Sequence, residues 1–264
     1  MKNTFRARLK AGETLYGSWL TIGSTTTAEI VAGAGFDWLT IDMEHSAIGL
    51  TLAQEMIRAV EHQGVVPLVR VGHNQPNLIK RVMDAGAAGV IVPMVNTADE
   101  AEQAVQSVKY PPRGFRGVGL ARAQQYGFGF DEYQAWNRDN SVVIVQVEHI
   151  RAVENLEAIL AVDGVDGFMV GPYDLSGSLG MPGRFDHPDV VAALDRVEAV
   201  AATTDAAPGF HVVRPDPDVL EAKRAKGYRF LSYGLDTFFL GSAARRAVAE
   251  ARGAATGPDN GDNA

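Results

Sequence analysis

Two apolar stretches of this chain each end in an acidic residue. Residues 142–147 lead into Glu148, and residues 168–173 lead into Asp174. A buried strand that ends in a carboxylate is unusual unless the acid has a function, because burying a charge is costly. The spacing of the two acids is that of neighbouring parallel strands joined by one helix. Glu148 and Asp174 are therefore expected side by side at one edge of a parallel sheet.

Two carboxylates at one edge predict a divalent metal site. Oxygen ligands suit Mg²⁺ or Mn²⁺, and two protein ligands leave positions open for water and substrate. Two alternatives remain open. The acids could form a general acid–base pair without a metal, or they could be solvated loop residues.

Further polar residues follow other apolar stretches. Arg70 ends one of them, and its planar guanidinium matches a carboxylate or a developing oxyanion. The alternative is a structural arginine that ties loops together through backbone carbonyls. His45 follows Asp42 and Glu44, and is the histidine best placed to act as a general base near neutral pH. His211 lies within an apolar run, which favours a satisfied core histidine over a ligand.

The lysines exclude one common mechanism. None of the six falls in a predicted strand or at a strand end; they are Lys2, Lys10, Lys80, Lys109, Lys223 and Lys226. An imine-forming lysine must be desolvated in the pocket, so Schiff-base chemistry is disfavoured. A phosphosugar site is also disfavoured, because residues 213–216 and 233–236 lack a glycine-rich phosphate nest.

The alternation of strands and helices predicts the fold. Strands are expected at residues 15–20, 38–42, 65–70, 89–93, 142–148, 167–171, 209–213 and 230–233. Helices are expected at residues 24–33, 52–62, 76–84, 98–109, 153–161, 190–203, 218–226 and 237–252. Continuous apolar strands indicate a parallel sheet covered on both faces. The pattern predicts an α/β fold, a (β/α)8 TIM barrel in one domain of residues 1–252. A doubly wound sheet is the rival, but no Gly-x-Gly-x-x-Gly follows a strand.

Two segments stand outside this alternation. Residues 110–140 show no sustained period, and a loop of this length inside a compact domain is usually functional. We expect it to serve the active site or an interface. Residues 253–264 are rich in Gly, Ala, Asp and Asn, which predicts a disordered tail.

Composition excludes several classes of protein. The 264 residues carry a net charge of −8, which argues against a nucleic-acid or an acidic-membrane partner. The absence of cysteine excludes disulfides, thiolate metal sites and cysteine nucleophiles. No N-terminal apolar segment and no run of about 18 apolar residues is present, so a cytoplasmic protein is expected.

The chain resembles the HpcH/HpaI aldolase family, the metal-dependent (class II) pyruvate aldolases. Within that family it is similar to the 4-hydroxy-2-oxoheptanedioate and 2-keto-3-deoxy-sugar-acid aldolase type. The resemblance covers nearly the whole chain in order, in residues 35–45, 69–70, 83–93, 110–117, 146–148, 171–176, 209–212 and 228–236. It includes Tyr-Pro-Pro-Arg-Gly-Phe-Arg-Gly from residue 110 and Gly-Pro-Tyr-Asp-Leu-Ser from residue 171.

The resemblance implies roles for ten residues. The catalytic residues would be His45, Arg70 and Asp84. A metal ion (Mg²⁺ or Mn²⁺, with Co²⁺ as an option) would be bound by Glu148 and Asp174. The substrate would contact Trp19, Gln146, Gly171, Pro172 and Tyr173. Arg70 would stabilise the pyruvate enolate, and His45 paired with Asp84 would be the base. The sequence pattern alone reads Asp84 as a structural residue at a helix end.

The implied reaction is the reversible cleavage of 4-hydroxy-2-oxo acids to pyruvate and an aldehyde through a metal-bound enolate. Alternatives on the same site are a citrate-synthase-like condensation, a decarboxylation or a cycloaddition. A non-catalytic binding protein is least favoured, because every expected ligand and base is present. The partners would be small keto acids and aldehydes.

The resemblance also implies a quaternary structure. It suggests a homo-hexamer, a trimer of dimers that swap the C-terminal helix at residues 237–252, with neighbouring subunits completing the site through residues 113–126. Residues 46–49 and 118–126 depart from the aldolases, and both are expected where the aldehyde half of the substrate lies.

Overall fold

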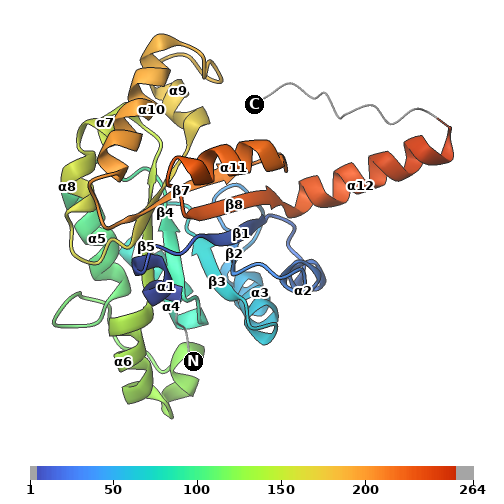
Figure 1. The fold of residues 1–264 in the computed structure, drawn as a ribbon. Coiled ribbons are helices and arrows are strands. Elements are labelled where there is room, and N and C mark those ends of the chain that lie inside the picture. The colour runs from blue at the N-terminus through green and yellow to red at the C-terminus, as the bar shows by residue number, and fades with distance from the viewer. Residues whose placement is uncertain (1–4, 254–264) are drawn as a thin grey trace.

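Eight parallel strands close into a barrel in the computed structural model, which describes residues 5–253 (Figure 1). Each strand pairs with the next in sequence, and the last pairs with the first. The strands are β1 (Leu15–Leu20), β2 (Trp38–Asp42), β3 (Val66–Arg70), β4 (Gly89–Val92), β5 (Val142–Val147), β6 (Gly167–Val170), β7 (Ala207–Val212) and β8 (Phe230–Leu235). The predicted (β/α)8 barrel is confirmed. Residues 254–264, most of the predicted disordered tail, lie outside the described residues.

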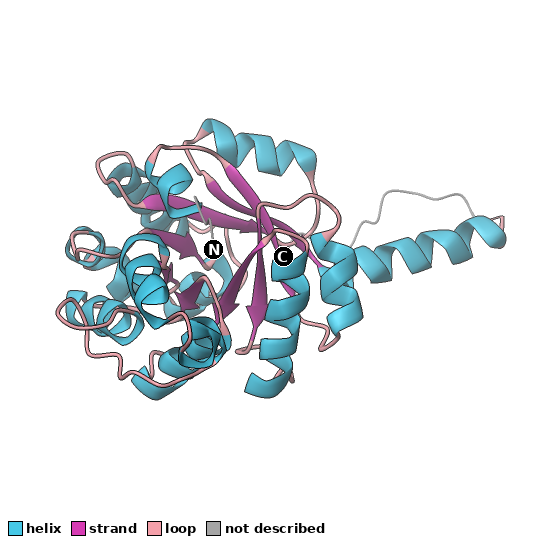
Figure 2. Ribbon diagram, turned by 90° about the horizontal axis from the view of Figure 1, so that it is seen from below, coloured by secondary structure: helices cyan, strands magenta, loops and turns pink. Residues whose placement is uncertain are grey.

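Helices cover the outside of the barrel (Figure 2). They are α1 (Phe5–Lys10), α2 (Thr25–Ala32), α3 (Leu50–His62), α4 (Pro76–Ala85), α5 (Ala98–Val108), the 3-10 helix η1 (Arg122–Gly127), α6 (Phe130–Asn140), α7 (Ile150–Glu154), α8 (Leu156–Leu160), α9 (Pro172–Ser178), α10 (Pro188–Ala201), α11 (Pro217–Ala225) and α12 (Asp236–Ala251). None of the described helices is both long and apolar enough to cross a membrane.

The strands are mostly apolar because both of their faces are largely buried. Successive side chains of a strand point to opposite sides. In β3, Leu68 belongs to the cluster that fills the barrel, whereas Val69 packs beneath the helices. On β5, Ile144 likewise belongs to the cluster inside the barrel, and Val145 packs beneath the helices. This double burial explains why the strands show continuous rather than alternating hydrophobicity.

The helix α1, which the sequence pattern did not indicate, closes the N-terminal end of the barrel. Phe5 and Leu9 are buried there, and Arg6 Nε donates to Asp166 Oδ1 at 2.6 Å just before β6. The helix was missed because it has six residues and only two of them are buried apolar side chains.

The expectation of an irregular segment at residues 110–140 is wrong in part, because η1 and α6 occupy its second half. The helix α6 was missed because its buried apolar side chains are few and polar contacts hold it. Lys109 Nζ donates to the carbonyl oxygens of Asn137 and Ser141 at 2.9 and 3.1 Å. This ammonium group satisfies carbonyls at the C-terminal end of α6, which have no partner within the helix.

Within one chain this segment does not reach the strand ends where the site was predicted. Arg122 in η1 pairs with Glu61 and donates to the carbonyl oxygen of Ala85. Those two residues lie at the C-terminal ends of α3 and α4, and helices that return between parallel strands end at the opposite face of the barrel. An active-site role for residues 113–126 therefore requires a second copy of the chain.

The helix α12 projects away from the barrel (Figures 1 and 2). Among its residues only Asp236 is buried. The carboxylate of Asp236 accepts from the backbone N–H groups of Thr21 and Ile22 at 2.9 and 2.8 Å, which fastens the start of α12 to the loop after β1.

Gly17→Ala is expected to destabilise the barrel by about 1–3 kcal/mol, the usual cost of overpacking. A methyl group at this position would overlap the indole ring of Trp38, which is fully buried and stacked on Phe230 at a centroid distance of 4.1 Å. Chemical unfolding measures the change. Gly49→Ala is the matched control, because a methyl group at Gly49 meets open space. Equal unfolding midpoints for the two variants would contradict the expectation.

Candidate active site

An ion pair joins the C-terminal ends of β2 and β3. Asp42 and Arg70 are register partners on these strands. Arg70 Nε and Nη2 donate to the two carboxylate oxygens of Asp42 at 2.9 and 2.6 Å. Burial alone would raise the pKa of Asp42, but the paired guanidinium outweighs it and the pKa is lowered. The bidentate contact fixes the plane of the guanidinium.

The face of the Arg70 guanidinium lies against an aromatic stack. Its central carbon is 4.4 Å from the centroid of Trp19 on β1. On β7, the ring of His211 stacks with the same indole at 5.3 Å between centroids. The bidentate ion pair with Asp42 and the cation–π contact with Trp19 together fix the position of the Arg70 guanidinium. Its remaining nitrogen, Nη1, lies 3.3 Å from Glu44 Oε2.

His211 is a neutral imidazole, in agreement with the core histidine expected from the sequence. Its Nε2 lies 3.1 Å from the carbonyl oxygen of Gly234, which only accepts, so the ring carries its proton on Nε2. Burial lowers the pKa of His211 to about 4, and the hydrogen bond to Gly234 opposes this only in part.

This histidine gives an expected pH dependence of stability. The folded pKa lies below the ordinary value of about 6.5, so the unfolded chain binds more protons between pH 4 and pH 6.5. Stability is therefore lost as the pH falls through this window, by about 2 kcal/mol at pH 5. His211→Gln keeps a donor for Gly234 and cannot titrate. Urea unfolding at pH 7 and pH 5 should show a smaller loss for this variant than for the unmodified protein, and an equal loss would refute the assignment.

Glu148 follows β5 directly and is buried. Its Oε1 accepts from the backbone N–H of Met94 at 2.7 Å, and its Oε2 accepts from Gln146 Nε2 at 3.0 Å. Met94 has a φ of 53°, an unusual conformation for a residue with a side chain. Burial raises the pKa of Glu148 to about 7, and the neighbouring Glu44 and Asp174 contribute to the rise. A cation beside this carboxylate would stabilise its charged form.

The carboxylate of Asp174 shares a space with that of Glu148. Asp174 lies in the first turn of α9, which follows β6 through Gly171. A methyl group on Gly171 would lie 3.1 Å from Glu148 Oε2 and 3.9 Å from Asp174 Oδ2. Glycine therefore leaves open a space that both carboxylates face. No three histidine, aspartate or glutamate side chains among residues 5–253 gather as a metal cage. Two carboxylates with open positions remain the ligand set that fits Mg²⁺ or Mn²⁺.

The turn from Gly171 to Asp174, where the resemblance implies substrate contacts, has few free backbone donors. The N–H of Gly171 donates to the carbonyl oxygen of Val147 at 3.1 Å, and Pro172 has no N–H. The donors left at this helix start are those of Tyr173 and Asp174. The ring of Tyr173 packs against Phe185 at 5.5 Å between centroids.

His45 and Asp84 do not meet within one chain. The side chain of His45 is 68% exposed, with its Nε2 3.9 Å from Glu44 Oε2. Asp84 lies near the C-terminal end of α4, at the opposite face of the barrel, where its Oδ1 accepts from Arg116 Nη2 at 2.6 Å. The implied pairing of His45 with Asp84 can therefore form only between two copies of the chain.

Two functional residues received no role from the sequence. Asp42 orients Arg70, and Glu44 pairs with Arg70 while its charge acts on Glu148 and Asp174. Burial raises the pKa of Glu44, with Arg70 opposing and with Asp42 and Asp174 adding to the rise. The signal for Asp42 was present in the sequence, because an acid and an arginine end consecutive apolar strands.

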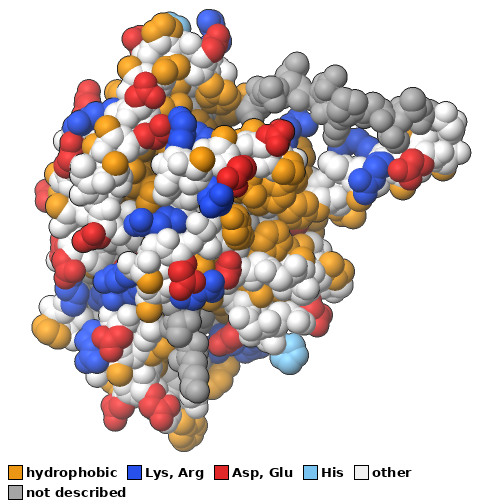
Figure 3. All heavy atoms as spheres, in the orientation of Figure 1, with side chains coloured by type: hydrophobic (Ala, Val, Ile, Leu, Met, Phe, Trp, Pro, Cys, Tyr) orange, Lys and Arg blue, Asp and Glu red, His pale blue; other side chains and the backbone are white. Residues whose placement is uncertain are grey.

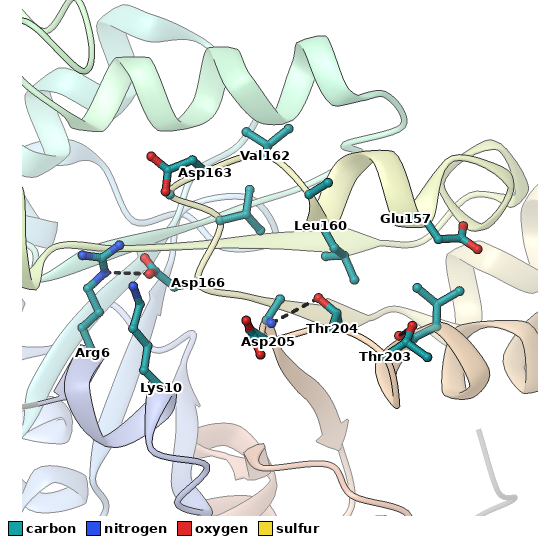
Figure 4. Close-up of a pocket in the computed structure, with 15 residues that line it drawn as sticks. Arg6, Lys10, Glu157, Leu160, Val162, Asp163, Asp166, Thr203, Thr204 and Asp205 are labelled. Carbon is teal, nitrogen blue, oxygen red and sulfur yellow. Dashed lines mark hydrogen bonds and ion pairs between the residues drawn. The ribbon is translucent and has the colours of Figure 1, made fainter.

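A second cavity lies at the other end of the barrel, between α1 and the C-terminal ends of α8 and α10 (Figure 4). It has a volume of about 710 Å³, and its lining includes the ion pair between Arg6 and Asp166. Active sites of such barrels lie at the C-terminal ends of the strands, and the N-terminal end mainly serves stability. The groups around Arg70 and Glu148 are therefore the candidate site.

Comparisons with known proteins identify the family of the chain. The HpcH/HpaI aldolase/citrate lyase family profile matches residues 15–243. A hydroxypyruvate/pyruvate aldolase of Roseobacter denitrificans is 39% identical over 239 residues, covering 90% of this chain and 93% of that protein. A 4-hydroxy-2-oxo-heptane-1,7-dioate aldolase of Escherichia coli is 40% identical over 251 residues, covering 94% and 95%.

A solved structure extends the likeness to the fold. A HpcH/HpaI aldolase/citrate lyase family protein from Burkholderia cenocepacia J2315 superimposes with a TM-score of 0.90 and 39% identity, covering 95% of this chain and 100% of that one. The prediction of an aldolase-type lyase is confirmed by these relatives. The chain belongs to the HpcH/HpaI aldolase/citrate lyase family.

Proposed function

We propose that this protein is a class II aldolase that cleaves 4-hydroxy-2-oxo acids reversibly to pyruvate and an aldehyde. The observation that carries the proposal is the fixed guanidinium of Arg70 beside the Glu148–Asp174 pair. Asp42 and Trp19 hold Arg70 in one orientation, so a donor pair is directed before substrate arrives. Such preorganised donors stabilise a developing oxyanion.

The reaction breaks one carbon–carbon bond, removes one proton from the 4-hydroxyl and adds one proton to C3. The bond between C3 and C4 breaks as the 4-hydroxyl loses its proton and becomes the aldehyde carbonyl. The electron pair passes to the oxygen on C2, where Arg70 stabilises the enolate of pyruvate, and C3 is then protonated. We assign the removal of the hydroxyl proton to His45. Gln146 and Trp19 line the site, and the backbone N–H of Tyr173 is available to the carboxylate of the keto acid.

Glu148 and Asp174 would hold the metal ion, which supplies Lewis-acid polarisation of the keto-acid oxygens when bound. Mg²⁺ and Mn²⁺ are the proposed ions, and Co²⁺ is a third option. Lys109, the buried lysine among the described residues, offers no competing imine route, since it lies at the other end of the barrel with its ammonium held by backbone carbonyls.

The test is pyruvate release from a panel of 4-hydroxy-2-oxo acids, with and without EDTA. We expect release that stops with EDTA and returns with added Mn²⁺ or Mg²⁺. Release that persists in EDTA would exclude the metal-dependent mechanism. Absence of release from every acid, with Mn²⁺ binding demonstrated, would favour another enolate reaction.

We further propose that the working form is a homo-hexamer, a trimer of dimers that swap α12. Two observations support an assembly of several chains. His45 and Asp84 lie at opposite faces of one barrel, and α12 carries exposed apolar side chains, with Leu240 65% exposed. Hydrophobic side chains also gather where α12 leaves the barrel (Figure 3).

Mixing two inactive variants tests the assembly. His45→Asn and Asp84→Asn should each be inactive alone. If the two residues meet across an interface, refolding the variants together should restore part of the activity, because some interfaces then carry both native residues. Light scattering gives the number of chains. A monomeric active enzyme, or no recovery in mixed hexamers, would overturn this proposal.

A further inference from the structure

A pocket of about 320 Å³ opens beside the candidate site, between the loops that follow β2, β3 and β4. Its lining includes Glu44, His73, Asn74, Met94, Glu100 and Gln103. Two of them touch the site itself. Glu44 Oε2 is 3.3 Å from Arg70 Nη1, and the backbone N–H of Met94 donates to Glu148 at 2.7 Å. A substrate with its keto-acid end at Arg70 and Glu148 can therefore extend into this pocket.

The pocket has acceptors and negative charge but no strong cation. Its described lining contains no lysine or arginine, and His73 is its basic side chain. Glu44 and Glu100 contribute carboxylates. Asn74 Nδ2 donates to the carbonyl oxygen of Glu100 at 2.8 Å, which fixes the orientation of the amide, and its buried Oδ1 has no partner among the described residues. A donor group such as a hydroxyl would complete this set.

We propose that this pocket receives the aldehyde half of the substrate and selects neutral, hydroxylated aldehydes over aldehydes that carry a carboxylate. This inference rests on the proposed aldolase function. A carboxylate in the pocket would approach Glu44 and Glu100. The described lining has no guanidinium or ammonium to receive it, and the nearby Arg70 is already paired with Asp42 and Glu44. Hydroxyls, in contrast, would donate to the free acceptors. Cleavage of a 4-hydroxy-2-oxo-heptane-1,7-dioate gives such an anionic aldehyde, so this chain should differ in preference from an aldolase for that substrate.

The first experiment measures kcat/KM for aldol addition of pyruvate to glyceraldehyde and to succinate semialdehyde, with Mn²⁺ present. The unmodified protein should prefer glyceraldehyde. Gln103→Arg places a guanidinium at the pocket and should shift the ratio toward succinate semialdehyde by about tenfold, a typical effect of one new charge-assisted contact. Gln106→Arg is the control, since it adds the same charge one turn further along α5 and does not line the pocket.

A second variant tests the hydroxyl contact without a change of charge. Asn74→Ala removes the free acceptor and should lower kcat/KM for glyceraldehyde by about five- to tenfold, with little effect on propionaldehyde, which has no hydroxyl groups. An equal change for both aldehydes would mean a structural role for Asn74 and would count against the proposal.

Exchange of the methyl protons of pyruvate in D₂O tests the enolate chemistry independently of the pocket, because this exchange needs no aldehyde. Exchange with a preference for succinate semialdehyde, or with ratios that Gln103→Arg leaves unchanged, overturns the pocket assignment and keeps the enolate chemistry. Absence of both exchange and addition overturns the proposed function, and this inference with it.

Discussion

Arg70→Lys is expected to lower kcat for pyruvate release by about 100- to 1,000-fold, the usual loss when one oxyanion donor is removed. Lysine keeps the positive charge but lacks the planar fork that binds both oxygens of Asp42 at 2.9 and 2.6 Å. It also loses the flat contact with Trp19. The charge would then no longer be fixed where the enolate oxygen forms. Steady-state kinetics with a saturating 4-hydroxy-2-oxo acid measures the effect.

Metal affinity distinguishes this effect from a general loss of structure. No hydrogen bond or ion pair joins Arg70 to Glu148 or Asp174 in the described part of the chain, so the Kd for Mn²⁺ should change little in Arg70→Lys. Arg58→Lys is the matched control, because Arg58 pairs with Glu55 on the exposed face of α3. Full activity of an Arg70→Ala variant would end the assignment of Arg70 to the enolate.

Asp174→Asn and Glu148→Gln should each weaken Mn²⁺ binding by at least about 100-fold and abolish pyruvate release. Even residues that only support a metal ligand contribute 10- to 100-fold to affinity, so loss of a direct ligand should cost more. The Asp174 variant is the cleaner one, because Asp174 is exposed. Both Glu148 oxygens accept hydrogen bonds, and a glutamine amide can match only one of these donors.

Electron paramagnetic resonance of free Mn²⁺ measures the affinity directly, without an assay of the enzyme. Glu154→Gln, an exposed residue on α7, is the control for the loss of one negative charge. Unchanged Mn²⁺ affinity in both ligand variants would show that the metal binds elsewhere. It would leave the alternative in which Glu148 and Asp174 act as an acid–base pair.

Sequence patterns predicted the elements that are decided by local hydrophobicity. All eight strands were found because each is a mostly apolar run whose faces are largely buried. The short helices α1 and α9 and the helix α6 were missed, since few apolar residues mark them. The contacts of the buried Lys109 explain why the sequence pattern did not predict α6. Its ammonium binds carbonyls of Asn137 and Ser141, residues distant in sequence, and no local pattern encodes such a contact.

The sequence by itself determined the barrel and a group of polar residues at its rim, because residues that end parallel strands must meet at one rim. Arg70, Glu148 and Asp174 were predicted on that ground. Tertiary structure decided how they are held and which residues stay apart. The register of β2 against β3 pairs Asp42 with Arg70, and β1 and β7 bring Trp19 and His211 to the same guanidinium. Because α4 runs antiparallel to the strands, Asp84 near its C-terminal end lies at the opposite face of the barrel from His45. Register and helix direction are properties of the whole closed sheet, so they appear only once the chain is folded.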